Sequence, residues 1–279
     1  MKRATKQTIL LALPAALALL VFFIIPMGYI LIQTLAEHGL DDFARFLSDS
    51  FYLDILWTTF RVSLISTAVS LLLGYPTAYY IARTRSRMRK VMMIIILFPF
   101  LVSAVVRSYG WMVILGNKGL LNSTLKSWGW IQSPLRIINT ETAVVIGMIH
   151  LLIPYMILSL VGVLQSIDPN VELAAQSLGA NRFSTFMKVV FPLSVPGIIS
   201  GCVLVFTMSM TSYVTPKLLG GSKYRMMATM VVQKINVEFD WGAASAISYI
   251  LLAAILLVQL LVVLITGGYM KRLGGGKSE

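Results

Sequence analysis

The chain carries little charge for its size. Of its 279 residues, 12% are Asp, Glu, Lys or Arg, whereas 57% are hydrophobic. A soluble domain contains about 25% charged and roughly 45 to 50% apolar residues. The mean hydropathy of +0.83 is correspondingly high. These values exclude an ordinary water-soluble globular protein and predict an integral membrane protein.

Cysteine is nearly absent, since Cys202 is the only one. A single cysteine excludes an internal disulfide and a cysteine metal cluster, and within an apolar run it is typical of a small buried residue. The pattern G-x-x-x-x-G-K-[ST] is also missing, so the chain lacks the backbone loop that holds the phosphates of ATP. We therefore predict no catalytic residue, no metal site and no cofactor in this chain.

Long uncharged runs are what the chain has instead. Six of them supply, or nearly supply, the roughly 20 apolar residues with which a helix crosses a bilayer. The third is long enough only if Arg107 is accepted near its far end. The first is too long for a cleaved signal peptide and is interpreted as a retained span. The sequence predicts an all-α bundle of six transmembrane helices, at about 8–32, 56–82, 91–114, 141–163, 192–214 and 243–266.

Basic residues predict the orientation. Lys and Arg residues favour the side that carries both chain ends by thirteen to eight, and cytoplasmic loops are enriched in these residues. The strongest element is the turn RTRSRMRK at 83–90. We therefore expect both termini in the cytoplasm. The net charge of +12 gathers at helix ends, which favours lipid as a partner and argues against nucleic acid.

One polar segment, residues 168–190, separates two apolar runs and is expected on the cytoplasmic side. Asp168 is predicted to cap a helix, because Asp is favoured at the position before a helix begins. Pro169 suits the first helical position, because the N–H that proline lacks is not used there. Gly179 is predicted to end this helix. Its apolar face, made of small residues that a groove of another protein can receive, follows the spacing i, i+3, i+4, i+7. The residues are Val171, Ala174, Ala175 and Leu178.

A second short helix is predicted directly after Gly179. Phe183, Phe186, Met187 and Val190 repeat the apolar spacing. Pro192 and Pro196 are then expected to bend the chain into the next apolar run.

Loop 168–190 resembles the cytoplasmic "EAA" loop of ABC importer permeases. The pattern of that family is E-A-A, three residues, G, nine residues, I, one residue, and L-P. Ala174, Ala175, Gly179 and Pro192 match it at the right spacings, while Leu173 stands at the acidic position. Glu172 lies one residue earlier, about 100° around the helix. The resemblance implies contact with an ATPase through Glu172, Ala174, Ala175, Leu178, Gly179 and Pro192.

Further segments look like the polyamine branch of that family, the spermidine/putrescine permeases. They are GYPTAYYIA at 74–82, FPFLVSAVVRSYGW at 98–111, GNKGLLN at 116–122 and YVTPKLLGG at 213–221. The resemblance implies a bacterial inner-membrane importer subunit for a polyamine or a related amino compound. Its implied partners are two ABC ATPases that bind ATP and Mg²⁺, a second permease in a heterodimer, and an extracytoplasmic solute-binding protein.

Polar residues within the expected spans are candidates for the translocation pathway. Each has a plainer interpretation: a long basic side chain reaches water, aromatic residues lie at the membrane interface, and hydroxyl groups bond between helices. For His150 the plainer role is a hydrogen bond to a backbone carbonyl freed by Pro154. Arg61 is open to the same snorkelling interpretation. The candidates are Arg107, Tyr109, Trp111, His150, Thr211 and Tyr213.

Two other functions fit a helical membrane protein. An intramembrane protease lacks support because the chain has no G-x-S-x-G motif. A secondary transporter or channel works without ATP, and Pro99 and Pro154 are able to break helices as such proteins require. We expect three regions: residues 1–55 with the first span and an outer segment, a permease core at 56–266, and a cytoplasmic tail at 267–279. The stretch at 226–235 is expected to dip back toward the bundle.

Overall fold

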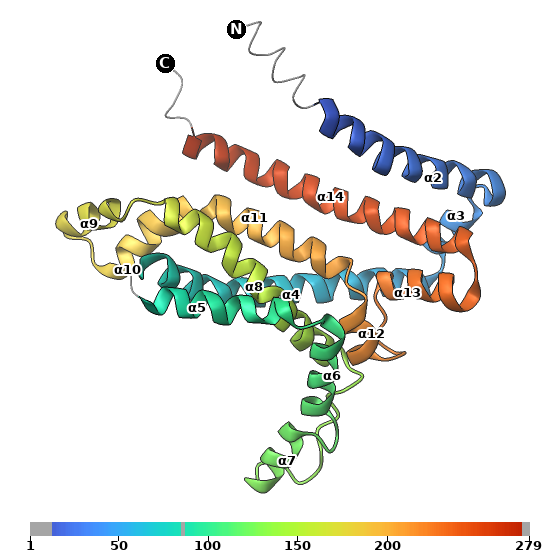
Figure 1. Cartoon of the computed structure of the whole chain (residues 1–279), viewed down its shortest axis with the longest axis horizontal. Coiled ribbons are helices and arrows are strands. Elements are labelled where there is room, and N and C mark those ends of the chain that lie inside the picture. Colours follow the sequence, from blue (N-terminus) through green and yellow to red (C-terminus); the bar gives the residue numbers. More distant parts are fainter. Residues whose placement is uncertain (1–12, 85–86, 275–279) are drawn as a thin grey trace, which may run out of the picture. The chain divides into compact units, whose positions relative to one another are not determined.

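The computed structural model describes residues 13–84 and 87–274 (Figure 1), and the basic residues before 13, positions 85–86 of the basic turn and the tail from 275 lie outside them. All regular elements in the described part are helices, with η marking π and 3-10 turns. They are η1 (Leu20–Ile24), α2 (Ile25–His38), α3 (Asp41–Ser48), α4 (Ser50–Arg83), α5 (Arg87–Leu97), η2 (Phe98–Leu101), α6 (Ala104–Leu115), α7 (Leu120–Ser127), α8 (Glu141–Ser166), α9 (Pro169–Ser177), α10 (Arg182–Thr185), η3 (Phe186–Val190), α11 (Phe191–Met210), α12 (Val214–Gly220), α13 (Met227–Gln233), η4 (Lys234–Glu238) and α14 (Trp241–Gly274).

Five helices in the described residues are long and apolar enough to cross a membrane. They are Leu13–Ala36, Ser50–Arg83, Glu141–Ser166, Arg182–Met210 and Trp241–Gly267. The pair Arg87–Leu101 and Ala104–Ser127, bent by 96°, makes a sixth span only if its two helices are counted together. The predicted all-helical membrane architecture is confirmed at this level.

The helix expected over 91–114 is broken in the structure into α5, η2 and α6. Pro99 lies in the 3-10 turn η2, where its missing N–H removes a helical hydrogen bond. A new helix, α6, then begins after Ser103, whose hydroxyl accepts a hydrogen bond from the Val106 amide at 3.3 Å. The segment is therefore broken by proline and restarted by a serine cap.

Contacts divide the chain into two compact units, and the first comprises residues 1–53 and 231–250. In this unit α2 is joined to the first turns of α14 by polar side chains. The hydroxyls of Thr34 and Ser245 lie 2.5 Å apart, and the Tyr249 hydroxyl donates to the carbonyl of Met27 at 2.5 Å. Such bonds hold apolar helices together where lipid removes the hydrophobic driving force.

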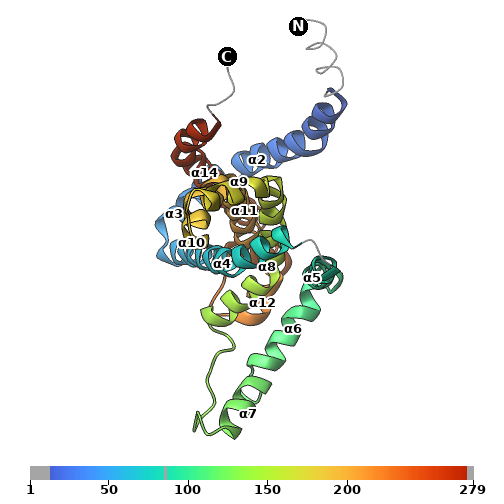
Figure 2. The same ribbon diagram turned by 90° about the vertical axis from the view of Figure 1, so that its left-hand side faces the viewer.

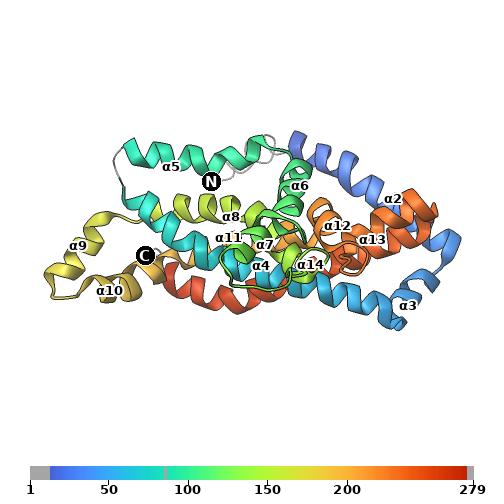
Figure 3. The same ribbon diagram turned by 90° about the horizontal axis from the view of Figure 1, so that it is seen from below.

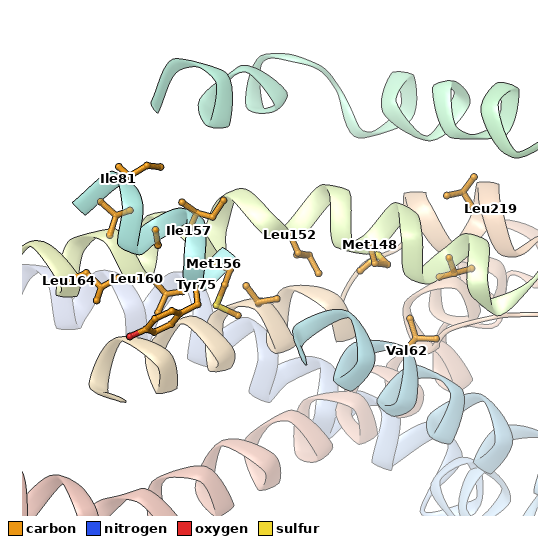
Figure 4. Close-up of a cluster of buried hydrophobic side chains, with 14 of the residues drawn as sticks. Val62, Tyr75, Ile81, Met148, Leu152, Met156, Ile157, Leu160, Leu164 and Leu219 are labelled. Atoms are coloured by element: carbon orange, nitrogen blue, oxygen red, sulfur yellow. The ribbon is translucent and has the colours of Figure 1, made fainter. Parts of the chain in front are cut away.

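The second unit, residues 54–230 and 251–279, is built around α8. Fully buried side chains recur every four residues along one face of this helix, and Figure 4 shows them packed between neighbouring helices. Helix α11 lies beside α8 at close range, since a Cβ added to Gly197 would meet the Val163 side chain at 2.8 Å. The buried residues of α8 are Met148, Leu152, Met156, Leu160 and Leu164.

Helix α4 also contacts this core, and it supplies the partners of Glu141 and Met227. Arg61 forms an ion pair with Glu141 in the first turn of α8, so its charge has a protein partner and is not merely snorkelling. Met227 is fully buried, and its amide donates to the Thr59 hydroxyl of α4 at 2.9 Å. The predicted return of the 226–235 stretch toward the bundle is confirmed for this part.

Two segments of the second unit flank α8 in the sequence. Figure 3 shows α9 and α10 together at one end of α8 and α11, and Figures 1 and 2 show α6 and α7 projecting away from α4 and α11. Loop 168–190 is therefore presented at the end of the bundle.

Candidate functional site

Helix α9 opens as its sequence predicts. Asp168 has an extended backbone, and its carboxylate accepts a hydrogen bond from the Asn170 amide at 2.9 Å. Pro169 occupies the first helical position. The cap satisfies one of the amides that every helix start leaves without a partner. This fixes where α9 begins relative to the end of α8.

Gly179 ends α9 in a left-handed conformation. Its φ is +90°, and the turn is closed by two hydrogen bonds, from Gly179 N to the Gln176 carbonyl at 2.9 Å and from Ala180 N to the Ala175 carbonyl at 3.1 Å. This pair of bonds is the Schellman motif. A Cβ added at Gly179 meets nothing within 4 Å, so glycine is required by the backbone conformation and not by space.

The second half of loop 168–190 joins the next span without a break. Asn181 caps α10 by accepting from the Ser184 amide at 2.7 Å, and the π turn η3 leads directly into α11. Residues Arg182–Met210 form one helix that contains Pro192 and Pro196. The predicted second helix therefore does not end before Pro192. Pro192 has no N–H to donate to the helix and lies in the first turn of α11. The π turn η3 directly before it changes the spacing of the backbone hydrogen bonds at this point.

The exposed surface of α9 and its C-cap carries apolar side chains next to polar ones. No residue of α9 is buried, and Leu178 is 90% and Leu173 59% exposed. Phe183 of α10 is 75% exposed beside them in sequence. Of the predicted apolar face, Val171 and Ala174 are also exposed and Ala175 is half-buried. An exposed apolar surface at the end of a polar loop is typical of a protein interaction site.

Glu172 points the other way, toward its own bundle. Arg83 of α4 donates from Nε to Glu172 Oε1 at 2.6 Å, and its Nη2 lies 2.5 Å from the same oxygen. The Tyr79 hydroxyl donates to Oε2 at 2.9 Å. The side chains of Arg83 and Glu172 are only 18% and 13% exposed. The carboxylate that we predicted as a contact for a partner protein thus has two partners within this chain.

Aromatic contacts join α4 to the other half of loop 168–190. The rings of Tyr79 and Phe186 have centroids 5.5 Å apart, and those of Tyr75 and Phe186 lie 5.7 Å apart, both edge to face. The hydroxyls of Tyr75 and Ser194 lie 2.7 Å apart. These contacts fix η3 and the start of α11 against α4.

Sequence reasoning missed Arg83 and Tyr79 as parts of this site. Arg83 was assigned to the basic turn alone. The available signal was spacing, because Tyr75, Tyr79 and Arg83 are four residues apart and therefore share one face of α4. A polar face at the end of a membrane helix is expected to meet another polar segment.

The structure brings together two of the predicted pathway residues. The Trp111 indole N–H of α6 donates to His150 Nδ1 of α8 at 3.1 Å. His150 therefore does not use this nitrogen for the carbonyl freed by Pro154, and its remaining nitrogen, Nε2, is the one that carries a proton in the neutral ring. Arg107, also on α6, has buried Nε and Nη1 atoms without a hydrogen-bond partner among the described residues.

Two of the other pathway candidates, Thr211 and Tyr213, lie next to helix ends, and Tyr109 lies in the middle of α6. Thr211 follows α11, and its hydroxyl donates to the Thr207 carbonyl of the same helix at 3.0 Å. Tyr213 precedes α12 and is half-buried, while Tyr109 is 54% exposed. In the described part of the chain, no group of three or more His, Cys, Asp or Glu residues lies together as a metal site requires.

Comparison with known proteins places the chain in a family. The family model "binding-protein-dependent transport system inner membrane component" matches residues 70–272. The chain is 37% identical over 202 residues to the spermidine/putrescine transport system permease protein PotB of Haemophilus influenzae, covering 72% of this chain and 71% of that protein. It is 34% identical over 222 residues to PotB of Escherichia coli, covering 78% and 80%.

A solved structure has the same fold. It is a chain of a bacterial alginate ABC transporter in complex with an alginate pentasaccharide-bound periplasmic protein, with a TM-score of 0.77, 18% sequence identity and 95% of each chain covered. At this identity the likeness concerns the fold alone.

Proposed function

Because the chain belongs to the family of binding-protein-dependent transport system inner membrane components, we propose that it is the permease that carries polyamines through an ATP-driven importer. Members of this family are transport subunits, so the chain is a component of an ABC importer and not an enzyme. It is a multi-pass protein of the bacterial inner membrane. The choice of polyamine as solute rests on the PotB relatives.

The observation that carries the proposal is the construction of loop 168–190. The short helix α9 is capped at both ends and is held to the bundle through Glu172. Leu173 of α9, Leu178 directly after it and Phe183 of α10 are exposed. In the proposal this loop and both termini face the cytoplasm, as the distribution of Lys and Arg supports. Two ATPase subunits, which hold ATP and Mg²⁺, receive the exposed face in a groove.

The residues of loop 168–190 have distinct roles in this proposal. Leu178 and Ala174 lie on the exposed side and contact the ATPase, whereas Ala175 and Glu172 face the bundle. Gly179 sets the direction of the chain after α9. Pro192 belongs to the continuous helix that leads from the loop into the membrane.

The solute passes between this chain and a second, different permease, after delivery by an extracytoplasmic solute-binding protein. The solved relative in complex with a periplasmic protein supports this assembly. Arg107, Tyr109, Trp111, His150, Thr211 and Tyr213 are the proposed pathway residues. The acidic residues of the five candidate spans, Asp54 and Glu141, lie within the first five residues of their helices, so we place the recognition of positive charge largely in the binding protein.

Co-purification of the complete importer tests the function. A tagged chain expressed with its partners is expected to bring down the ATPase, and Leu178→Asp is expected to reduce the recovered ATPase about tenfold or more. The reason is that a docked leucine contributes about 1.5 to 3 kcal/mol and a buried carboxylate is penalised further. Leu120→Asp is the matched control, since Leu120 is 67% exposed in the first turn of α7, away from the loop.

Two results would contradict the proposal. One is recovery of the ATPase by Leu178→Asp as efficiently as by Leu120→Asp. The other is solute uptake by the purified chain alone without ATP, which would favour a secondary transporter or channel.

A further inference from the structure

The last two turns of α4 present three side chains on one face. Tyr75, Tyr79 and Arg83 are spaced four residues apart, and neighbours at this spacing lie above one another on a helix. Each of them contacts loop 168–190 or the helix that follows it. The face is therefore continuous from the core of the bundle to the loop.

Arg83 joins three helices through its guanidinium group. Its Nε and Nη2 contact Glu172 of α9, as described above. Its Nη1 donates to the carbonyls of Leu164 at 3.0 Å and Ile167 at 3.2 Å, at the end of α8. Carbonyls at a helix end have no partner within the helix, so Arg83 supplies one. The planar group of arginine holds several such partners at once, which the compact ammonium group of lysine cannot do.

Removing one partner of the contact between Arg83 and Glu172 is expected to cost more than removing one partner of an exposed ion pair. Both side chains are less than one fifth exposed, and hydrogen bonds use both oxygens of the carboxylate. Exposed pairs contribute little because water and salt screen them, whereas removing one partner of a shielded pair leaves an uncompensated charge. A displacement of α9 is therefore expected to move α4 and the end of α8 with it.

The aromatic contacts act on the other half of the loop. Tyr79 contacts Glu172 through its hydroxyl and Phe186 through its ring, so one side chain links α9 and η3. Tyr75 continues this contact toward α11 through Ser194. Both arms of loop 168–190 are thus attached to the same face of one helix.

We propose that the face of α4 formed by Tyr75, Tyr79 and Arg83 receives the movement of loop 168–190, with Arg83 and Glu172 as its positioning pair. This inference rests on the proposed function, since it specifies how an ATPase-driven movement reaches the membrane helices. The position of Glu172 supports it, because the acidic residue faces the bundle while the adjacent Leu173 is exposed toward the partner. In this proposal Glu172 connects α9 to the other helices of the permease, and the exposed apolar residues of the loop contact the ATPase.

A positioning role and a merely structural role predict different results. Loss of folding lowers the number of working complexes, so solute uptake and solute-stimulated ATP hydrolysis fall together and their ratio is unchanged. Loss of the connection lets the ATPase complete its cycle without moving α4, so the number of solute molecules imported per ATP falls. The ratio is therefore the decisive quantity.

The experiment uses the complete importer, with both permeases, the ATPases and the binding protein, in proteoliposomes supplied with spermidine. Glu172→Gln and Arg83→Gln are each expected to lower spermidine imported per ATP about fivefold or more, the lower end of typical coupling between sites. The double variant is expected to be no worse than either single one, because both remove the same pair. Arg83→Lys keeps the positive charge but loses the planar guanidinium group with its several donors, so its ratio of spermidine imported per ATP is expected to lie between those of the wild type and Arg83→Gln.

Arg87→Gln is the control, because Arg87 is an exposed basic residue of α5 close to Arg83 in sequence. Its ratio is expected to equal that of the wild type. An unchanged ratio in Glu172→Gln and Arg83→Gln, or strictly additive losses in the double variant, would overturn the inference. A wild-type complex without spermidine-stimulated ATP hydrolysis would instead overturn the proposed function.

Discussion

The two segments that flank α8 are held in shape by different chemistry. Between α6 and α8, the buried side chain of Asn122 donates from Nδ2 to the carbonyls of Gly116 and Leu135 at 3.0 Å, and its Oδ1 accepts from the Leu135 amide at 2.8 Å. After α8, loop 168–190 depends on the charged contact of Arg83 with Glu172. One segment uses a neutral amide and the other an ion pair.

The difference lies also in what each contact connects. The partners of Asn122 are 6 and 13 residues away, so the amide closes its own segment. Arg83 and Glu172 are 89 residues apart and belong to different helices. A local neutral network keeps a segment rigid, whereas a contact between distant helices makes one element follow another. Changes in the two segments should therefore have different consequences.

The largest effect is expected at Gly179. In Gly179→Asp the φ of +90° imposes backbone strain of about 1 to 3 kcal/mol, and the carboxylate lies at a helix C-terminus, where negative charge is unfavourable. Solute-stimulated ATP hydrolysis by the reconstituted importer is expected to fall about thirtyfold or more. Gly179→Asn separates the causes, because asparagine tolerates left-handed conformations and adds no charge, so it should retain more activity. Full stimulation with Gly179→Asp would remove this residue from the coupling assignment.

Asn122→Ala is expected to affect stability and not coupling. It leaves two carbonyls and one amide of the 116–135 segment without their partner, at a cost of about 2 kcal/mol or more. The measurement is faster hydrogen exchange across 116–135 and a lower Tm of the purified complex. Ser127→Ala, which removes an exposed hydroxyl bonded to Thr124, should change neither. A fall in solute imported per ATP in Asn122→Ala would show that the 116–135 segment also affects coupling, and would contradict the difference proposed between the two segments.

The smallest effect is expected at Arg107. Its buried Nε and Nη1 have no hydrogen-bond partner among the described residues, so we expect the second permease to supply an acceptor in the assembled importer. Arg107→Ala should lower spermidine uptake about fivefold, the equivalent of about one hydrogen bond, while the ATPase still co-purifies. Arg61→Ala is the comparison, because Arg61 already pairs with Glu141 and its loss should reduce stability first. Normal uptake by Arg107→Ala would favour the snorkelling interpretation.

The ends of α9 could be predicted from the sequence because their chemistry is local. Asp168 caps an amide two residues away, and the turn at Gly179 is closed by hydrogen bonds from Gly179 N and Ala180 N to carbonyls three and five residues earlier. The spans followed from the lengths of uncharged runs. These features depend on a few neighbouring residues and on the bilayer thickness.

The contacts of the site could not be predicted in the same way. Helical geometry places Glu172 about 100° from Leu173 but does not say which helix lies opposite. Its partner Arg83 and the pairing of Arg61 with Glu141, 80 residues apart, depend on how α4 and α8 pack. The break in the third span had a local signal in Pro99, yet a proline permits a kink as well as a full restart, and the cap at Ser103 decides between them.

The helical segment Arg182–Met210 connects loop 168–190 directly to the far end of a membrane span. Its 29 residues span about 43 Å at the rise of an α-helix, and the π turn η3, Pro192 and Pro196 all lie in the half nearer the loop. A tilt of only about 5° at α10 therefore displaces Met210 by about 4 Å, which is roughly the width of a methylene chain. In the proposed importer, a small rearrangement of the ATPase at loop 168–190 would therefore become a larger displacement at the other end of this span.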